Sequence, residues 1–181
     1  TGIPWNGGVT VNGIVYAIPS DDSDVLAYDP SSNKFSRSTI PSSIRVRGDD
    51  AKHQWSGGVT VDGIVYGIPY NSKYVLIYDP SSNKVSGSEK IPSSIGGERS
   101  TSWYGGVTVN GIVYGIPYWS NYVLIYDPSS NKVSGSEQIP SSIDGGDWQW
   151  LGGVTLNGIV YGIPFNSNYV LIYDPSSNKV S

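Results

Sequence analysis

The sequence contains no cysteine and no methionine, and it has a single histidine. Without cysteine, neither a disulfide nor a thiolate metal site can help to hold the fold together, and cysteine usage leaves the compartment undetermined. Methionine is missing even at position 1, so we expect a chain that was processed, trimmed or excised from a longer one. The first residues have neither the charge nor the apolar stretch of a signal peptide.

Long apolar runs and an excess of positive charge are missing as well. No run approaches the roughly 20 apolar residues that a membrane-spanning helix needs. Eleven basic residues stand against 15 acidic ones, for a net charge of −4, and no basic stripe could neutralise a phosphate backbone. The sequence therefore predicts a soluble chain that takes neither a membrane nor nucleic acid as a partner.

Repetition is what the sequence has in abundance. The stretch GGVTVDGIVYGIPYNSKYVLIYDPSSNK (57–84) returns almost unchanged in three further copies, which start at Gly7, Gly105 and Gly152. A tryptophan two places before each copy recurs at intervals of 50, 48 and 47 residues: Trp5, Trp55, Trp103 and Trp150. A period of roughly 40 to 50 residues that is rich in strand formers is typical of a propeller or a similar array. We expect the recurrent tryptophans to be structural and to pack beside the first strand.

Each copy has the pattern of four short strands. In the second copy we expect them at residues 58–61, 64–68, 74–78 and about 84–89. The first two strands flank Asp62-Gly63, a dipeptide that favours the tight turn of a hairpin. Pro69 closes the second strand because it has no N–H for the ladder. The third strand is apolar on both faces, which implies stacking on both sides, and the polar fourth strand suits an outer edge.

These patterns predict an all-β fold, a β-propeller built from four-stranded antiparallel blades, with four blades per chain. We treat residues 1–181 as a single domain. The blades are expected at approximately residues 5–48, 49–97, 98–145 and 146–181. One blade alone would leave both faces in water, so its neighbours must cover them.

The order of GGV, an Asn-Gly or Asp-Gly turn, IVY and a VLIYDP corner resembles the kelch repeat of β-propellers. The resemblance covers all four copies and implies kelch-like blades. Two features depart from kelch: Ile-Pro stands where a second double glycine is usual, and the fourth-strand tryptophan is replaced by Phe35, Val85, Val133 and Val180. The near-identity of the copies also resembles recently amplified or designed symmetric propellers, whose implied function is that of a scaffold.

Two ways of completing the ring remain open. The chain begins and ends at about the same point of a blade, so two chains could join head to tail into an eight-bladed homodimer. The alternative is a four-bladed monomer, which needs a steep tilt around a narrow axis and has no disulfide to hold it shut. We favour the dimer, with a second copy of the chain as the partner.

Side chains able to do chemistry are scarce. His53 stands without cysteine or paired carboxylates beside it, so we interpret it as a solvated loop residue. Asp21, Asp22 and Asp24 form a cluster that we also expect to be solvated. The repeated aspartates precede Pro-Ser-Ser-Asn, a context in which the carboxylate caps nearby backbone: Asp29, Asp79, Asp127 and Asp174. The sequence therefore predicts no catalytic residue, no cofactor and no metal, and not an enzyme.

Binding is expected in the segments that differ between copies. These are the loop between the second and third strands and the linker before each tryptophan, which equivalent blades would place at one level of the ring. Candidate ligand-binding residues there are aromatic: Tyr70, Tyr118, Trp119, Trp148 and Phe165. Such rings beside small polar groups suit a glycan or a protein ligand, and make a lectin-like binding module the alternative function. The competing interpretation is that these rings pack between blades or cover the core.

Overall fold

The structure is a computed structural model that describes residues 2–45, 52–96, 102–143, 146 and 148–181. Sixteen strands form four separate sheets of four. Blade 1 contains β1 (Trp5–Val11), β2 (Ile14–Pro19), β3 (Asp24–Asp29) and β4 (Lys34–Thr39). Blade 2 contains β5 (Trp55–Val61), β6 (Ile64–Pro69), β7 (Leu76–Asp79) and β8 (Lys84–Gly87). Blade 3 contains β9 (Trp103–Val109), β10 (Ile112–Pro117), β11 (Leu124–Asp127) and β12 (Lys132–Gly135). Blade 4 contains β13 (Trp150–Leu156), β14 (Ile159–Pro164), β15 (Leu171–Asp174) and β16 (Lys179–Val180).

Each blade is an antiparallel meander in which sequence order is also spatial order. This confirms the predicted all-β propeller with four-stranded blades. The described part of the chain includes no helix that is long and apolar enough to cross a membrane. The expected borders between blades fall at residues 48/49, 97/98 and 145/146, which lie at least partly outside the described residues.

The tight turns form where the sequence predicts them. Asn12 and Gly13 have φ angles of 50° and 80°, and the other three blades repeat this geometry. Positive φ at both central residues gives the turn a twist that matches its flanking strands. The third strands differ from the expectation, since β7 begins at Leu76 rather than at Tyr74. A serine-capped loop occupies the difference, because Ser72 Oγ accepts the N–H of Tyr74 at 3.1 Å.

The first strands start earlier than expected and carry a bulge. β5 begins at Trp55, and its register against β6 shifts between Trp55 and Gly58. Gly57 sits in the shifted segment with a φ of 71°, in the left-handed region that favours glycine. A Cβ at this position would lie 2.9 Å from the Cα of Gly105 in the next blade. Glycine therefore allows the inner strands of neighbouring blades to approach backbone to backbone.

The core lies between the blades, in three clusters that each join two neighbours. In every pair an isoleucine of one blade covers a glycine of the next. An added Cβ on Gly106 would lie 2.6 Å from Ile68 Cδ1, and one on Gly153 would lie 2.7 Å from Ile116 Cδ1. Stability is thus shared between blades, as the repeat pattern implies.

The recurrent tryptophans have the structural role expected of them. Three are fully buried: Trp55, Trp103 and Trp150. Each donates its indole N–H to a backbone carbonyl, as Trp55 does to Tyr74 O at 2.8 Å. Trp5 is only half-buried, its bond to Asp24 O is longer at 3.3 Å, and the guanidinium of Arg37 lies 5.1 Å from its ring. Blade 1 therefore lacks the cover that a preceding blade gives the others.

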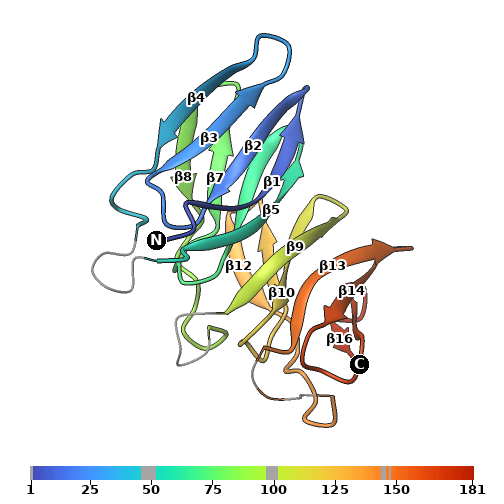
Figure 1. Ribbon diagram of the computed structural model, residues 1–181. Helices are drawn as coiled ribbons and strands as arrows, with labels where there is room; N and C mark the ends of the chain where they lie inside the picture. The colour runs from blue at the N-terminus through green and yellow to red at the C-terminus, as the bar shows by residue number, and fades with distance from the viewer. Residues whose placement is uncertain (1, 46–51, 97–101, 144–145, 147) are drawn as a thin grey trace.

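The four blades form an arc and not a closed ring. The inner strands lie side by side in the order β1, β5, β9 and β13. No contact of that extent joins β13 back to β1 among the described residues. Figure 1 shows β1 and β13 on blades at opposite ends of the arc. One end of the molecule therefore presents a face of blade 1 and the other a face of blade 4.

Candidate functional site

The variable segments meet on one face of the arc. The residue before each inner tryptophan donates its backbone N–H to the loop that follows the second strand of the preceding blade. These bonds run from Gln54 to Ser20 O, from Ser102 to Tyr70 O and from Gln149 to Tyr118 O, at 3.0 to 3.1 Å. Linkers and loops thus lie at one level, as the repeats predict.

Aromatic side chains gather on this face. Tyr70, Tyr118 and Phe165 occupy equivalent places in blades 2, 3 and 4 and form what we call the aromatic row. Ring centroids lie 5.8 Å apart between Tyr70 and Tyr118, and 6.3 Å apart between Tyr118 and Phe165. The ring centroid of Trp119 lies 6.5 Å from that of Tyr118 and 5.7 Å from that of Trp148. The structure therefore brings all five predicted ligand-binding residues into one array.

Burial separates the members of the array. Tyr70, Tyr118 and Trp119 are half-buried, whereas Phe165 and Trp148 are exposed. Burial, followed by the neighbouring tyrosines, raises the pKa of the Tyr70 hydroxyl above its ordinary value. The phenol therefore stays protonated at neutral pH and can donate a hydrogen bond.

Tyr104 joins the array from the inner strand of blade 3, and sequence reasoning missed it. Its ring lies 5.8 Å from Tyr70 and 5.5 Å from Tyr118. Its hydroxyl accepts a hydrogen bond from Asn6 Nδ2 at 2.9 Å, which ties blade 3 to blade 1 across the axis. The same Asn6 nitrogen donates to Ser56 Oγ at 3.1 Å. The signal in the sequence was the variable position after each tryptophan, which reads Asn6, Ser56, Tyr104 and Leu151.

A small cavity opens beside these groups, and we call it the axial pocket. It measures about 170 Å³ and is lined by Ile3, Asn6, His53, Ser56, Tyr70 and Tyr104. The rings of Tyr70 and Tyr104 meet almost at a right angle, at 88°. The pocket thus combines two aromatic walls with hydroxyl, amide and imidazole groups.

His53 and its acidic neighbours are less solvated than the sequence suggested. His53 is half-buried, and its backbone N–H donates to Asp21 Oδ1 at 2.7 Å. Its ring nitrogen Nδ1 lies 3.2 Å from Ser20 Oγ. Asp22 and Asp24 are also half-buried, and their carboxylates lie 3.4 and 3.5 Å from Arg37. The prediction of a solvated cluster is wrong, because Arg37 of the same blade contacts Asp22 and Asp24, and His53 in the linker to blade 2 contacts Asp21.

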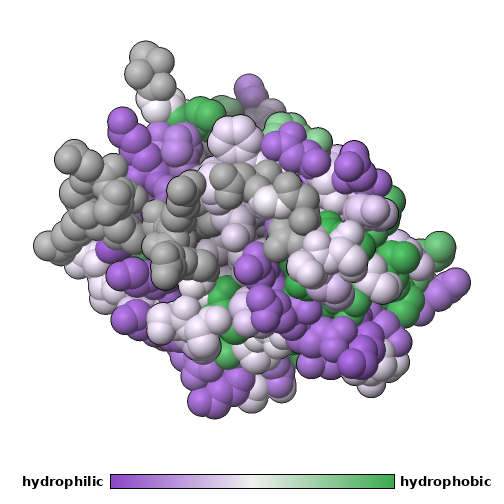
Figure 2. All heavy atoms as spheres, turned by 90° about the horizontal axis from the view of Figure 1, so that it is seen from below, coloured by the Kyte–Doolittle hydropathy of each residue, from purple (hydrophilic) through white to green (hydrophobic). Residues whose placement is uncertain are grey.

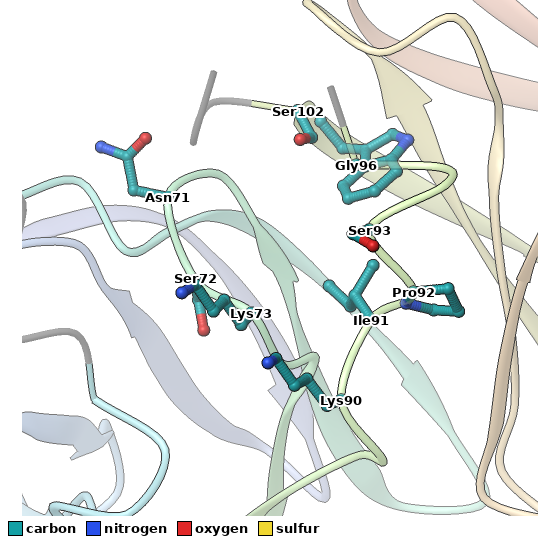
Figure 3. Close-up of a pocket in the computed structure, with 10 residues that line it drawn as sticks. Asn71, Ser72, Lys73, Lys90, Ile91, Pro92, Ser93, Gly96 and Ser102 are labelled. Carbon is teal, nitrogen blue, oxygen red and sulfur yellow. The ribbon is translucent and has the colours of Figure 1, made fainter. Parts of the chain in front are cut away.

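A larger cavity of about 390 Å³ lies between blades 2 and 3 (Figure 3). In the view of Figure 3, Ile91 and Pro92 lie on the right, Ser72 and Lys73 lie on the left, and Lys90 lies between them at the bottom. The described residues of its lining include no carboxylate. Within the described ranges, no group of three His, Cys, Asp or Glu side chains could hold a metal ion.

The repeated aspartates cap their turns. Asp79 Oδ1 accepts the N–H of Ser81 at 2.9 Å and its hydroxyl at 2.7 Å, while Oδ2 accepts the hydroxyl of Ser82 at 2.7 Å. The other three blades repeat these bonds. The serine hydroxyls lower the pKa of Asp29 and of Asp79 to about 2. The capping role inferred from the sequence is therefore what the structure shows.

We expect these caps to make the fold acid-sensitive. Asp29 and Asp79 have a pKa of about 2 in the folded protein against an ordinary value of 3.8, and the same hydrogen bonds lower the pKa of Asp127 and Asp174. These carboxylates therefore stabilise the fold above their ordinary pKa and lose this contribution as pH falls through the folded pKa. The melting temperature, followed by circular dichroism, should be flat from neutral pH to about pH 5 and fall steadily below about pH 4. An Asp79→Asn/Asp127→Asn variant should start lower at neutral pH and decline less. An equal decline in both proteins would contradict the assignment.

The end of the arc at blade 4 exposes residues whose equivalents in blades 2 and 3 are buried or partly buried. We call this set the trailing face, and it consists of Val154, Leu156, Ile163, Val170 and Ile172. Ile163 is 45% exposed, whereas its equivalents Ile68 and Ile116 are 0% exposed. Figure 2 shows hydrophobic residues gathered on the right of the view, the side on which blade 4 lies in Figure 1.

The opposite end exposes the complementary face of blade 1. This leading face consists of Trp5, Gly8, Val15, Leu26, Tyr28 and Phe35, all half-buried or exposed. Val15 is 39% exposed, whereas Val65 and Val113 are 0% exposed. We use the word seam for the contact of one blade's trailing face with the next blade's leading face. The chain contains three seams and leaves one trailing and one leading face open.

Comparisons with known proteins agree on the fold. A scan against models of protein families and a search of curated proteins find no match. Among solved structures, the chain is similar to virginiamycin B lyase from Staphylococcus aureus, with a TM-score of 0.74, 12% identity and coverage of 98% of this chain and 54% of that one. The chain thus spans about half the length of that lyase.

Two computationally designed proteins are also similar. Ika4 matches with a TM-score of 0.63, 9% identity and coverage of 94% of this chain and 90% of that one. Ika8 matches with a TM-score of 0.63 and 10% identity, over 97% of this chain and 47% of that one. At such low identities these likenesses establish the β-propeller fold and nothing about activity.

Proposed function

We propose that the chain is a non-enzymatic β-propeller scaffold that self-assembles by blade stacking, with two chains closing an eight-bladed homodimer. The observation that carries the proposal is the pair of open faces at the ends of the arc, one trailing and one leading. Three seams inside the chain show what such faces contact. A second copy of the chain supplies the matching face at both ends.

The isoleucine of the trailing face has a defined place at the seam. Within the chain, Ile68 covers Gly106 and Ile116 covers Gly153. Gly8 is the equivalent glycine of blade 1, and the three atoms nearest to a Cβ added to it all belong to its own blade, to Tyr16 and Ala17. Ile163 of one chain would therefore cover Gly8 of the next.

A pair of tyrosines also joins the two blades at each internal seam. At each internal seam a second-strand tyrosine meets a third-strand tyrosine of the next blade, as Tyr66 meets Tyr126 with ring centroids 5.6 Å apart. The two other seams have separations of 5.4 and 5.6 Å. Tyr161 on blade 4 has no such partner within the described chain. Across the proposed seam its partner is Tyr28 of the second copy.

Blade 1 keeps an apolar leading face, although several of its other positions have diverged. A terminal blade that caps a repeat array usually has a polar outer face. Here Gly8, Val15 and Leu26 match their equivalents in the inner blades. Polar changes affect Asp24 and Arg37, which form an ion pair with each other. The centre of the leading face is therefore apolar and suited to packing against another blade rather than to contact with water.

The number of blades in the closed ring is not given by the comparisons. The chain aligns with 47% of Ika8 and 54% of the lyase, but with 90% of Ika4. Two such arcs related by a two-fold axis would close, and closure ends head-to-tail growth. We also infer that the blades are kelch-like, on the double-glycine and YDP positions that they share with that repeat.

The absence of catalysis is part of the proposal. Its support is that the repeated aspartates are engaged in turn caps and that His53 is the only histidine. The lyase likeness, at 12% identity, brings no activity to this chain.

The proposal is tested by solution mass, measured by light scattering after size exclusion at several concentrations. We expect a mass near twice 19.4 kDa that falls only on strong dilution. A monomer at all concentrations would contradict the dimer, and a ladder of larger species would show that the head-to-tail contact does not close.

One residue is expected to weaken the closing seam. Internal seams carry a backbone hydrogen bond from Gln54, Ser102 or Gln149 to the preceding blade. Pro4 stands at the equivalent place in blade 1 and has no N–H to donate to Phe165 O of the second copy. We expect Pro4→Gln to tighten the dimer about 10-fold, since each of two seams would gain a bond of about 0.5 to 1.5 kcal/mol.

Dilution series of both proteins by light scattering measure this effect. Pro41→Gln serves as a matched control, because Pro41 is exposed in the linker after β4 and belongs to neither of the two open faces. An unchanged dissociation constant for Pro4→Gln would place Pro4 away from the contact.

A second candidate function is a lectin-like carbohydrate- or protein-binding module. The aromatic row and its neighbours favour it, because Phe165 and Trp148 stay exposed beside half-buried tyrosines. Soluble proteins place such rings at binding sites more often than elsewhere on their surface. A rigid propeller that presents the array would combine both functions.

A further inference from the structure

We propose that the axial pocket binds one ring of a neutral saccharide. This deepens the binding-module candidate by naming the site and the ligand chemistry. It does not depend on the dimer, because the pocket is built within one chain by blades 1, 2 and 3. Of its lining residues, only Tyr70 belongs to the ligand-binding set predicted from the sequence; the others are Ile3, Asn6, His53, Ser56 and Tyr104.

Two tyrosine rings give the pocket its apolar walls. Tyr70 and Tyr104 stand at 88° to each other with centroids 5.8 Å apart, so they enclose a corner rather than form a flat stack. A pyranose has a face of C–H groups that can lie on one ring while its edge meets the other. The cavity of about 170 Å³ has room for a single small ring of this kind.

Polar groups line the opposite side. Ser56 Oγ accepts from Asn6 Nδ2, which leaves the serine O–H to donate to a ligand. The Tyr70 hydroxyl makes no hydrogen bond with any residue that the structure describes, and burial keeps it protonated. His53 is engaged through Nδ1, so Nε2 remains for a sugar hydroxyl.

The balance of these groups distinguishes a sugar from a proline-rich peptide. Aromatic grooves also bind proline rings, but a proline ring has no hydroxyl with which to satisfy a serine, a phenol and an imidazole. Polar groups that a ligand leaves unpaired on desolvation oppose binding. A neutral ligand is favoured because the described residues that line the pocket include no lysine, arginine or carboxylate.

The aromatic row gives a longer glycan a path out of the pocket. From Tyr70 it passes Tyr118 to Phe165, one ring in each of three blades. The pocket would hold one sugar unit, and the row would support its neighbours. Affinity for a single unit should therefore depend on the pocket alone.

Saturation-transfer NMR with the full chain tests the proposal. The probes are the methyl pyranosides of glucose, mannose, galactose and N-acetylglucosamine at about 10 mM, which fills most of a site of millimolar affinity. We expect transfer to at least one of them. Transfer to none of the four, or to a polyproline peptide in their place, would overturn the proposal.

Substitutions locate the binding. Tyr70→Ser and Tyr104→Ser insert residues that other blades carry at the same places, Ser20 and Ser56, and should weaken the responding sugar at least 10-fold. Tyr70→Phe keeps the ring and should cause a smaller loss. Phe165→Ser, at the far end of the row, is the matched control and should leave single-sugar binding unchanged.

A separate variant keeps this proposal apart from the dimer. Ile163→Asp, which is aimed at the seam, should bind the sugar with unchanged affinity. Equal affinities of Tyr70→Ser, Tyr104→Ser and the unmodified chain would place the sugar elsewhere and overturn the assignment, whatever the solution mass proves to be.

Discussion

Replacing Ile163 with aspartate should leave the chain folded and turn the dimer into a monomer. In one chain this side chain is 45% exposed, so a charge there meets water. Across the proposed seam the same position is closed, and an unpaired buried carboxylate costs several kcal/mol. Because a closed dimer has two seams, we expect the dissociation constant to rise at least 100-fold, or about 2.7 kcal/mol.

Val15→Asp tests the other side of the seam. Val15 is 39% exposed on the leading face of blade 1, far along the chain from Ile163. In a head-to-tail dimer both variants fail to associate. In a dimer of blade 4 against blade 4, only Ile163→Asp would fail. Light scattering of the two variants therefore identifies which faces meet.

Mixing the two variants gives a sharper result. The pair can form one intact seam, between the trailing face of the Val15→Asp chain and the leading face of the Ile163→Asp chain. We expect heterodimers at high concentration, although each variant alone stays monomeric. Leu151→Asp adds the same charge to blade 4 on the axial strand and should leave the dimer intact. Loss of the dimer in this control would mean that any charge on blade 4 disrupts it.

The sequence predicts the blades well because the information is local and repeated four times. The Asn-Gly and Asp-Gly turns, the prolines that end the second strands and the aspartate caps are all short-range devices. Each is present in the structure at its expected place. Strand bounds near Trp55 and Leu76 were less well predicted, because a bulge and a serine-capped loop replace regular ladder there.

The candidate site was predicted only in part, because it depends on contacts between blades. The five aromatic residues are brought together as expected. Tyr104 was missed since it lies within a strand, where a large side chain usually signals packing. Its role depends on Asn6, 98 residues away. His53 and Asp21 were taken as solvated for the same reason, as their partners come from another blade.

The hydrogen bonds that link the fourth strands of neighbouring blades could not be predicted from local sequence patterns either. Glu89 Oε1 accepts the backbone N–H of Val133 at 2.8 Å, and Oε2 accepts from Lys132 at 2.9 Å. Glu137 repeats these bonds one blade later. Blade 1 has no glutamate directly after its fourth strand, and its link to blade 2 comes instead from Ser38 near the end of β4, whose hydroxyl donates to Tyr78 Oη at 3.4 Å. The seams are thus similar at their centres and different at their rims.

The largest effect on stability is expected at the stacked inner glycines. Gly57→Ala places a Cβ 2.9 Å from the Cα of Gly105, and neither backbone can move without shifting a blade. It also puts alanine at a φ of 71°, which costs roughly 1 to 2 kcal/mol. Overpacking adds typically 1 to 3 kcal/mol, so we expect a total loss of about 2 to 5 kcal/mol in the free energy of unfolding.

Gly152→Ala is the matched control for Gly57→Ala. Gly152 has a similar φ of 69°, but no described atom beyond its two chain neighbours lies within 4 Å of a Cβ built on it, because blade 4 is the last of the arc. Measured by urea unfolding in the monomeric Ile163→Asp background, this variant should lose only the backbone-strain part, about 1 to 2 kcal/mol. Equal losses of unfolding free energy in the two variants would mean that the close approach of the inner strands does not add to the cost of Gly57→Ala.

Gly152→Ala should have a further effect in a chain that keeps Ile163 and can therefore dimerise. If two arcs close a ring, Gly152 of one copy meets Gly7 of the other, as Gly57 meets Gly105 inside the chain. Gly152→Ala should then weaken the dimer as well as the fold. The stability loss at Gly152 would therefore be small in the monomer and grow with protein concentration in the unmodified background, since the glycine contact forms only across the closed seam.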